Sequence, residues 1–289
     1  MVENKKQMVK LIECPRDAMQ GLHDFIPTAT KAAYINQLLK IGFDTIDFGS
    51  FVSPKAIPQL KDTAEVLSKL DLSATTSKLL AIIANTRGAN DAVLFEEIDY
   101  LGFPFSISET FQQRNTNSSI LQSLKTVEEV QSLCVKHNKK LVVYISMAFG
   151  NPYGDEWNSD IVINWTKKLA DLGIEIIALS DTIGVSNKEN ISYLFSNIIP
   201  EFKTVEIGAH LHTTPDTWKE KIVAAYENGC RRFDGAIKGF GGCPMATDKL
   251  TGNMPTENLV SYFKEINVNT NIDTIEFEKS LLAANAIFL

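Results

Sequence analysis

Two histidines in the C-terminal third of the chain have the spacing of a metal-binding pair. His210 and His212 stand at the end of an apolar run that begins near Thr204, and such a run predicts a β-strand. Because alternate side chains of a strand share one face, the two imidazoles point the same way, with Cβ atoms about 6–7 Å apart. They can therefore close on one metal ion, although a pair of polar residues at a strand end is the plain alternative.

The elements that must position these histidines follow from the hydrophobic pattern. Short apolar runs alternate with longer helical stretches along the chain, and eight such βα repeats without a linker predict a closed (β/α)8 TIM barrel. The expected strands are 8–13, 45–48, 79–84, 97–101 (with its loop at 105–108), 141–147, 174–179, 204–212 and 232–236. We treat residues 1–289 as a single catalytic domain, in which C-terminal helices over 256–289 exceed what a minimal barrel needs.

Local signals support this interpretation. Gly42, Gly173 and Gly229 each stand between a predicted helix and the next strand, which is the position of a C-cap glycine. The alternative fold is an open doubly wound sheet, which would need a glycine-rich phosphate loop after the first strand. The segment 14–17, Cys-Pro-Arg-Asp, is not such a loop.

Polar residues collect where a barrel enzyme needs them. The active site of a TIM barrel lies at the carboxyl ends of its strands, and polar side chains follow or end most of the predicted strands. They are Glu13, Arg16, Asp17, Asp47, Ser50, Asn85, Ser146, Ser180, Asp181, Thr182, His210, His212 and Lys238. Each alone could be a loop residue that satisfies backbone groups, but their collection at one rim predicts an active site.

The ligand types narrow the choice of metal. Asp17 follows the first strand and the His pair ends the seventh, so only the eighth strand separates them and one ion can reach all three. Two imidazoles with carboxylate and amide oxygens suit Mg, Mn, Zn, Co or Fe and require no thiolate. Asn253 is either a further oxygen ligand or only a turn former. Open coordination positions would remain for a substrate.

A glycine-rich loop follows the eighth strand and carries one cysteine. Cys243 stands in the sequence Gly-Phe-Gly-Gly-Cys-Pro over 239–244, within a segment 239–253 that we interpret as a lid. A thiol on such a lid can exchange a proton with a carbon centre, and a small buried turn residue is the alternative. The other cysteines are widely spaced, so we expect their thiols to be reduced and their side chains to have a packing role. They are Cys14, Cys134 and Cys230.

Composition limits the partners. With 28 Lys and Arg against 35 Asp and Glu, the net charge is −7, and there is no basic arm, so nucleic acid is not an expected partner. No apolar run approaches the roughly 18 residues of a membrane span. The first ten residues resemble neither a signal peptide nor a transit peptide, so we expect a cytoplasmic protein with no membrane partner.

Together these motifs resemble the hydroxymethylglutaryl-CoA lyase family, a branch of the metal-dependent carbon–carbon lyases and synthases. The resemblance covers nearly the whole chain, in order. The segments that carry it are Pro-Arg-Asp at 15–17, Ser-Phe-Val-Ser-Pro-Lys at 50–55, Ser-Asp-Thr-Ile-Gly at 180–184, His-Leu-His at 210–212, Gly-Gly-Cys-Pro at 241–244 and Gly-Asn at 252–253. The second and fifth of these are fairly specific to the lyase branch.

The resemblance implies roles for individual residues. It implies a divalent cation, with Mg or Mn expected and Zn or Co as alternatives, held by Asp17, His210, His212 and Asn253. It implies catalytic roles for Arg16, Cys243, Asp47, Asp181 and His210, and contacts of an acyl-CoA substrate with Arg16, Gln20, Ser50 and Lys55. The helices after Gly252 are a candidate surface for a homodimer.

The implied reaction is a divalent-metal-dependent retro-Claisen cleavage of 3-hydroxy-3-methylglutaryl-CoA to acetyl-CoA and acetoacetate. Several residues depart from the family pattern, among them Cys14, Ala18, Thr213 and Met245. These departures keep open a related lyase or aldolase for another 3-hydroxy-acyl-CoA or a 2-keto acid. A non-catalytic barrel that binds a metabolite is a third, different hypothesis.

Overall fold

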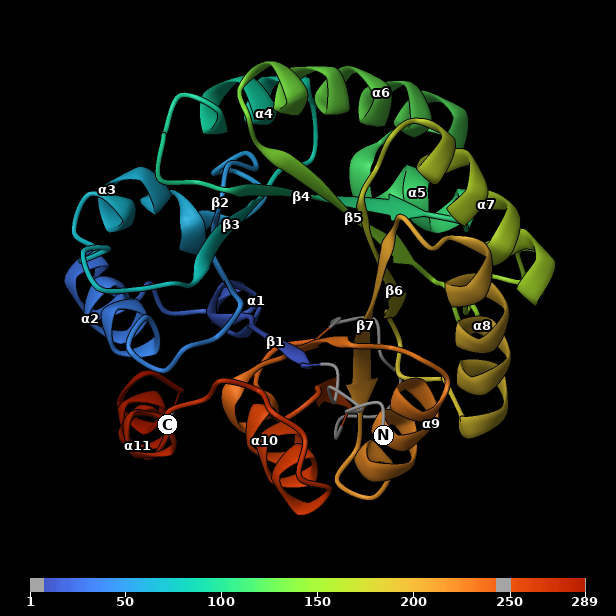
Figure 1. Cartoon of the computed structure of the whole chain (residues 1–289). Helices are drawn as coiled ribbons and strands as arrows, with labels where there is room; N and C mark the ends of the chain where they lie inside the picture. Colours follow the sequence, from blue (N-terminus) through green and yellow to red (C-terminus); the bar gives the residue numbers. More distant parts are fainter. Residues whose placement is uncertain (1–7, 243–250, 289) are drawn as a thin grey trace.

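Eight parallel strands close into a barrel in this computed structural model, which describes residues 8–242 and 251–288 (Figure 1). The strands are β1 (Lys10–Glu13), β2 (Thr45–Ser50), β3 (Lys78–Ile82), β4 (Tyr100–Ser106), β5 (Lys140–Ser146), β6 (Ile176–Asp181), β7 (Glu206–Thr213) and β8 (Arg232–Gly235). Each strand pairs in parallel with its sequence neighbours, and the pairing of β1 with β8 completes the ring. The predicted TIM barrel is therefore confirmed.

Helices surround the barrel as an outer layer (Figure 1). They are α1 (Pro15–Gln20), α2 (Thr28–Leu38), α3 (Thr63–Leu67), α4 (Thr86–Ala92), α5 (Glu109–Thr116), α6 (Ile120–Lys136), α7 (Ser159–Asp171), α8 (Lys188–Glu201), α9 (Trp218–Glu227), α10 (Thr256–Glu265) and α11 (Thr274–Phe288), with short 3-10 turns η1 (Pro58–Leu60) and η2 (Ile237–Gly239). The last helix, α11, packs against α2 on the outside of the barrel. None of the described helices is long and apolar enough to cross a bilayer.

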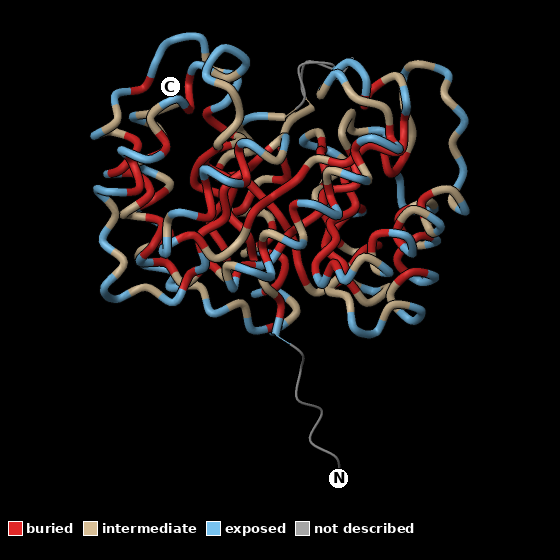
Figure 2. Tube along the Cα trace, turned by 90° about the horizontal axis from the view of Figure 1, so that it is seen from above, coloured by how far each residue is buried: buried red, intermediate tan, exposed pale blue. Residues whose placement is uncertain are grey.

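The core has two parts, because every strand is buried on both faces. The larger cluster lies between the strands and the helices, and Figure 2 shows its buried chain as the centre of the molecule. A smaller cluster fills the barrel interior and consists of Leu80, Ile82, Val142, Tyr144, Ile176 and Ala178. Parallel strands require apolar side chains on both faces, and this is why the strands read as continuous apolar runs in the sequence.

Side-chain caps fix where several outer helices begin. The first residue before each of these helices accepts a hydrogen bond from a backbone N–H of the first turn; these caps are Asn85, Ser108, Ser119, Asn158 and Asn187. Such caps satisfy donors that the helix itself leaves free. Asn85 accepts from the N–H of Gly88 at 2.9 Å, so this candidate rim residue starts α4.

The glycines predicted as C-caps have the required backbone. Gly42, Gly173 and Gly229 have φ of 93°, 80° and 99°, a left-handed conformation that glycine adopts without a steric penalty. Each ends a helical stretch just before a strand, as the sequence indicated.

Two elements differ from their predictions. The fourth strand, expected at 97–101, spans Tyr100–Ser106, and its register with β5 continues through Pro104. A Gly-Phe-Pro sequence reads locally as a turn, but pairing with β5 along its whole length overrides that signal. The Ser-Pro sequence at 53–54 predicts the start of a helix that runs toward Leu70 with a break at Pro58. The structure has only the short elements η1, which begins at Pro58, and α3 in this stretch.

Candidate metal and active site

Three candidate ligands converge at the carboxyl end of the barrel. His210 and His212 come from β7 and Asp17 from α1, the short helix that follows β1. One ligand atom of each lies within 4.8 Å of the other two. The strand order places β1, β8 and β7 side by side, which is how residues about 190 positions apart in the sequence meet. The predicted convergence is observed.

The imidazole of His212 has one ring nitrogen in a hydrogen bond and one without a partner among the described residues. Its Nδ1 lies 3.0 Å from the carbonyl oxygen of Thr182, and because a carbonyl only accepts, Nδ1 carries the hydrogen. The other nitrogen, Nε2, is buried and has no hydrogen-bond partner among the residues described. Burial and the nearby charge of His210 lower the pKa of His212 to about 4, so the ring is neutral near pH 7 and Nε2 offers a lone pair.

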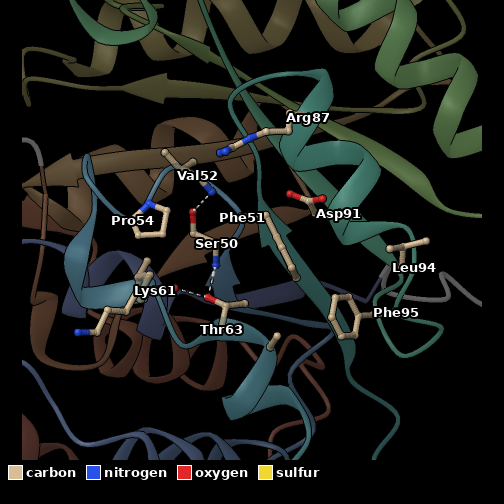
Figure 3. Close-up of a pocket in the computed structure, with 12 residues that line it drawn as sticks. Ser50, Phe51, Val52, Pro54, Lys61, Thr63, Arg87, Asp91, Leu94 and Phe95 are labelled. Carbon is tan, nitrogen blue, oxygen red and sulfur yellow. Dashed lines mark hydrogen bonds between the residues drawn. The ribbon is translucent and has the colours of Figure 1, made fainter.

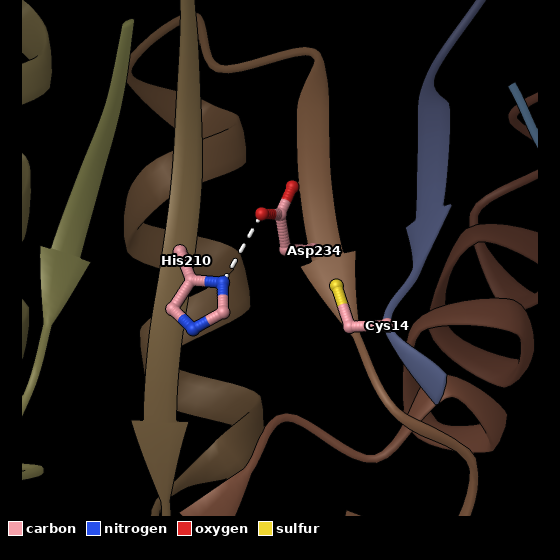
Figure 4. A group of neighbouring side chains, drawn as sticks. All are labelled: Cys14, His210 and Asp234. Carbon is pink, nitrogen blue, oxygen red and sulfur yellow. Dashed lines mark hydrogen bonds and ion pairs between the residues drawn. The ribbon is translucent and has the colours of Figure 1, made fainter. Parts of the chain in front are cut away.

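His210 is oriented by a carboxylate rather than by a carbonyl. Its Nδ1 lies 3.1 Å from Oδ2 of Asp234 on β8 (Figure 4), which leaves Nε2 for a ligand. Burial acts to lower the pKa of His210, but the hydrogen bond and charge of Asp234 outweigh it and raise the pKa above its usual value. A carboxylate behind a histidine fixes its tautomer and increases its basicity as a metal ligand.

The thiol of Cys14 lies beside His210 and Asp234. Cys14 Sγ, Asp234 and a ring nitrogen of His210 form a second cluster within 4.8 Å (Figure 4). Burial raises the pKa of Cys14 well above its usual value, and a metal is bound by the thiolate rather than the thiol. We therefore assign Cys14 to packing behind His210, in agreement with the sequence. All three described cysteines, Cys14, Cys134 and Cys230, are free.

Asn253 lies at the same site. It forms part of a two-residue strand, β9 (Gly252–Asn253), that pairs antiparallel with β7 and places Asn253 opposite His212. Its Nδ2 donates to Asp17 Oδ2 at 2.6 Å and to the carbonyl of Phe240 at 2.9 Å, so Oδ1 is the amide atom that remains for a cation. A side chain at Gly241 would be strained, because its φ is 86° and a Cβ there would lie 2.7 Å from the main-chain carbonyl oxygen of Asp17.

Arg16 forms the cationic side of the site. Its Nε and Nη2 bind the carboxylate of Asp47 as a fork, with the shortest contact at 2.5 Å. Its Nη1 lies 2.9 Å from Asp17 Oδ1 and 3.0 Å from Gln20 Oε1. Two carboxylates and an amide oxygen thus fix the direction of one buried guanidinium.

The two carboxyl groups at Arg16 differ in their acidity. Burial acts to raise the pKa of Asp17, but Arg16 and the two imidazoles outweigh it and lower the pKa to about 2. For Asp47 burial prevails over the attraction of Arg16 and raises the pKa to about 6. Asp17 is therefore ionised at neutral pH, as a ligand must be, whereas Asp47 is the weaker acid behind the guanidinium.

Asp181 lies next to this site but is occupied by other groups. Its Oδ2 accepts from Ser186 Oγ at 2.5 Å and from Lys221 Nζ at 2.9 Å. Lys221 and Asp181 are both fully buried. The carboxylate that the resemblance associated with catalysis is thus half of a buried ion pair.

Ser50 and Lys55 are separate from the ligand cluster. Ser50 lines a groove of about 410 Å³ between α3 and α4, together with Phe51 and Phe95 (Figure 3). Its Oγ accepts from the N–H of Val52. Lys55 is exposed and does not line this groove.

Two other rim candidates have structural partners. Glu13 accepts from the N–H of Ile237 at 2.9 Å and from Thr256 Oγ1 at 2.5 Å, so it joins β1 to η2 and α10. Burial raises its pKa to about 8. The amine of Lys238 binds Asn285 on α11. Cys243, with the rest of 243–250, lies outside the described residues.

Sequence reasoning missed Asp234 and Lys221. The available signal for Asp234 was an acidic residue inside a predicted buried strand, since burial of a lone carboxylate is costly. The signal for Lys221 was weaker: the sequence places a lysine in the middle of an otherwise apolar helix face. Neither signal identifies the partner, which comes from a neighbouring strand.

The fold and the site define a TIM barrel with a candidate cation site at its carboxyl rim. A family model described as HMGL-like matches residues 9–281, and the chain belongs to this family. It is 33% identical over 283 residues to a hydroxymethylglutaryl-CoA lyase of Bacillus subtilis, covering 98% of this chain and 92% of that protein. It is 31% identical to the cytoplasmic 3-hydroxy-3-methylglutaryl-CoA lyase of Rattus norvegicus, covering 92% of this chain and 77% of that protein.

Solved structures agree with the sequence comparison. The HMG-CoA lyase from Brucella melitensis has a TM-score of 0.90 at 27% identity, covering 97% of this chain and 99% of that chain. An HMG-CoA lyase from Acinetobacter baumannii, solved with coenzyme A and 3-methylmalate, has a TM-score of 0.89 at 31% identity and covers 97% of this chain and 91% of that chain. The family expected from the sequence motifs is confirmed.

Proposed function

We propose that this protein is a carbon–carbon lyase that cleaves 3-hydroxy-3-methylglutaryl-CoA to acetyl-CoA and acetoacetate with a divalent cation. The observation that carries the proposal is the convergence of Asp17, His210 and His212 beside the buried guanidinium of Arg16. Relatives named as lyases for this thioester, at about one-third identity over nearly the full length, support the substrate.

The donor set fits a divalent cation. The buried, unpartnered Nε2 of His212 and the low pKa of Asp17 are the marks of groups arranged for a ligand. We infer that Asp17, His210, His212 and Asn253 hold the ion, with Mg or Mn expected and Zn or Co as alternatives. When bound, the cation lowers the pKa of a coordinated hydroxyl group.

The chain's own residues then account for the remaining steps. His210 or Asp17 accepts the proton of the tertiary hydroxyl, the bond between C2 and C3 breaks, and its electron pair passes to the thioester as an enolate. Arg16, held by Asp47 and Gln20, stabilises the enolate oxygen, a charge that develops only as the bond breaks. Cys243 protonates the enolate carbon, which completes acetyl-CoA.

The first residue that departs from the family pattern after His212 forms hydrogen bonds with its sequence neighbours. Thr213 Oγ1 lies 2.9 Å from Thr217 Oγ1 and 3.0 Å from the carbonyl of Thr214. These side chains therefore bind one another at the start of α9. Ser50 and Lys55 are further proposed substrate contacts.

The test is turnover of purified protein with 3-hydroxy-3-methylglutaryl-CoA, before and after chelation and after return of Mg²⁺ or Mn²⁺. We expect cleavage that chelation abolishes and the cation restores. Cleavage insensitive to chelation would exclude the metal. Turnover only with other 3-hydroxy-acyl thioesters or 2-keto acids would identify a related lyase, and no turnover with stoichiometric metabolite binding would identify a binding protein. A cytoplasmic location and a homodimer stay predictions.

A further inference from the structure

Lys221 has an unusual position for an amine. It lies in α9, the helix that follows the metal-binding strand, and its side chain is 1% exposed. Its Nζ lies 2.9 Å from Asp181 Oδ2, 2.7 Å from the carbonyl of His212 and 3.2 Å from the carbonyl of Gly184. An ammonium group has three hydrogens, and here all three have acceptors at the carboxyl ends of β6 and β7.

Two of these acceptors belong to one rim segment, residues 181–186. Within this segment the N–H and Oγ of Ser186 donate to Asp181 Oδ2 at 3.1 and 2.5 Å. The N–H of Gly184 donates to the carbonyl of Asp181 at 3.2 Å. Segment 181–186 is thus a closed turn around the Asp181 carboxylate, and Lys221 connects that turn to β7.

The same segment contains the acceptor that orients His212. The Thr182 carbonyl receives the Nδ1–H of His212 at 3.0 Å, and Thr182 Oγ1 in turn accepts from the N–H of Met147 at 2.8 Å. Lys221 therefore holds both sides of the His212–Thr182 hydrogen bond: it binds the main chain of His212 directly and the segment of Thr182 through Asp181 and Gly184.

We propose that Lys221 is a positioning residue for the metal centre. It fixes segment 181–186 against the end of β7, so that His212 keeps its Nδ1–H on Thr182 and presents Nε2 to the cation. Asp181 is then the partner of Lys221 through Oδ2, while its Oδ1 is buried and has no hydrogen-bond partner among the described residues. This inference deepens the function proposed above and rests on it, because it requires that the site bind a divalent cation.

A buried ion pair that only stabilises the fold is the competing explanation, and the chain provides a matched control for it. Lys31 is also 1% exposed, and its Nζ binds Asp62 Oδ1 at 2.7 Å and the carbonyl of Gln59. This pair connects α2 to the segment before α3 and contacts none of the candidate ligands. Lys31→Met therefore removes a buried Lys–Asp pair of the same kind away from the site.

The experiment is calorimetric titration of metal-stripped full-length protein with Mn²⁺, at a temperature where circular dichroism shows each variant folded. We expect Lys221→Met to weaken Mn²⁺ binding by about 10- to 100-fold, the range for residues that orient a metal ligand. Lys31→Met should lower the thermal midpoint while leaving the Kd within about twofold, because distant sites act independently.

The double variant Asp181→Asn with Lys221→Met distinguishes the loss of the Lys221 contacts from the effect of leaving the Asp181 charge unpaired. It removes the unpaired buried carboxylate that the single variant leaves, so it should recover thermal stability. The side-chain link that Lys221 adds to the β6–β7 pairing stays broken. We expect its Mn²⁺ affinity to remain reduced. It also supplies the decisive measurement if Lys221→Met does not fold.

A second readout concerns the ring itself. The chain has 4 histidines, so ¹⁵N spectra of the metal-free protein can resolve the tautomer of His212. Wild type should show Nδ1–H, and the double variant a mixture of tautomers. Wild-type affinity and an unchanged tautomer in the double variant would overturn the role of Lys221. Failure of the wild-type protein to bind Mn²⁺ would instead overturn the proposed metal function, and this inference with it.

Discussion

His210 and His212 are two positions apart on the same strand, yet they differ in their hydrogen-bond partners and in the direction of their pKa shifts. Both donate from Nδ1, one to the Asp234 carboxylate on β8 and the other to a carbonyl after β6. The pKa of His210 is raised by its anionic partner, whereas burial and a cationic neighbour lower that of His212 to about 4. The strand determines that the two rings share one face, and groups from the neighbouring strands determine the pKa of each ring.

This difference has a chemical consequence. A histidine with a carboxylate behind it is the more basic of the two and the better proton acceptor. A histidine on a carbonyl stays neutral and serves as a ligand alone. We therefore propose that His210 is the histidine that can accept a proton, in a state in which its Nε2 does not hold the ion, and that His212 serves as a ligand.

The largest expected effect comes from removal of either ring. His210→Ala and His212→Ala should each weaken Mn²⁺ binding by more than about 100-fold, the upper range for residues that only orient a ligand, because each removes a proposed ligand. Calorimetric titration measures this, with circular dichroism as the control for folding. If one variant kept the wild-type affinity, the histidine replaced in it would not bind the ion, and the two histidines could not both be ligands.

Arg16→Met tests the side of the site that contacts neither ring. We expect kcat to fall by about 10²-fold or more, the effect of losing an oxyanion donor, while Mn²⁺ still binds. Steady-state kinetics with the thioester separates kcat from KM. A change confined to KM would contradict a role for Arg16 in the transition state.

Asp234→Asn removes the anionic partner that distinguishes His210. Metal affinity should fall about 10- to 100-fold, since an amide holds the ring without adding to its basicity. The neighbouring variant Cys14→Ala is the control, because the thiol packs against the same pair but donates nothing to it. Equal affinities in Asp234→Asn and wild type would mean that the carboxylate does not distinguish the two histidines.

The smallest effect on catalysis is expected at Glu13, the rim carboxyl group that accepts from Ile237 and Thr256 rather than from either ring. Its folded pKa, about 8, exceeds the unfolded value of 4.5 because burial disfavours the charged form. Its contribution to stability is therefore complete below pH 4.5 and is lost as pH rises through about 8, with a total on the order of a few kcal/mol.

Thermal melts between pH 5 and 8.5 measure this contribution. Wild type should lose stability across the range, whereas Glu13→Gln should lose less, because a neutral amide still accepts from Ile237 and meets Thr256. Turnover at neutral pH should stay near the wild-type value. Parallel melting curves for the two proteins would mean that Glu13 titrates normally.

Much of the fold could be predicted because its signals are local. The alternation of apolar runs and helical stretches, and glycines such as Gly42 and Gly173 before strands, depend on neighbours in the sequence. The fourth strand was misplaced for the same reason, since Gly102 and Pro104 are local breakers and only pairing with β5 makes them a strand.

The candidate ligands themselves followed from residue type and order. His210 and His212 share a strand face, and Asp17 follows a strand that a barrel places nearby. The partners behind the ligands did not follow, because Asp234, Thr182 and Lys221 reach the rings from other elements. Asn85 shows the converse, since a polar rim residue in the sequence is a helix cap in the structure.

By itself the sequence determined the barrel, the family and the residue types that could hold a cation, because strand periodicity and chain order are properties of one dimension. Only the tertiary structure decided which nitrogen of each histidine is free, which carboxyl group is ionised and which amine holds the rim together. Those properties depend on burial and on distances of about 3 Å between side chains from different strands, and such distances exist only after the ring has closed.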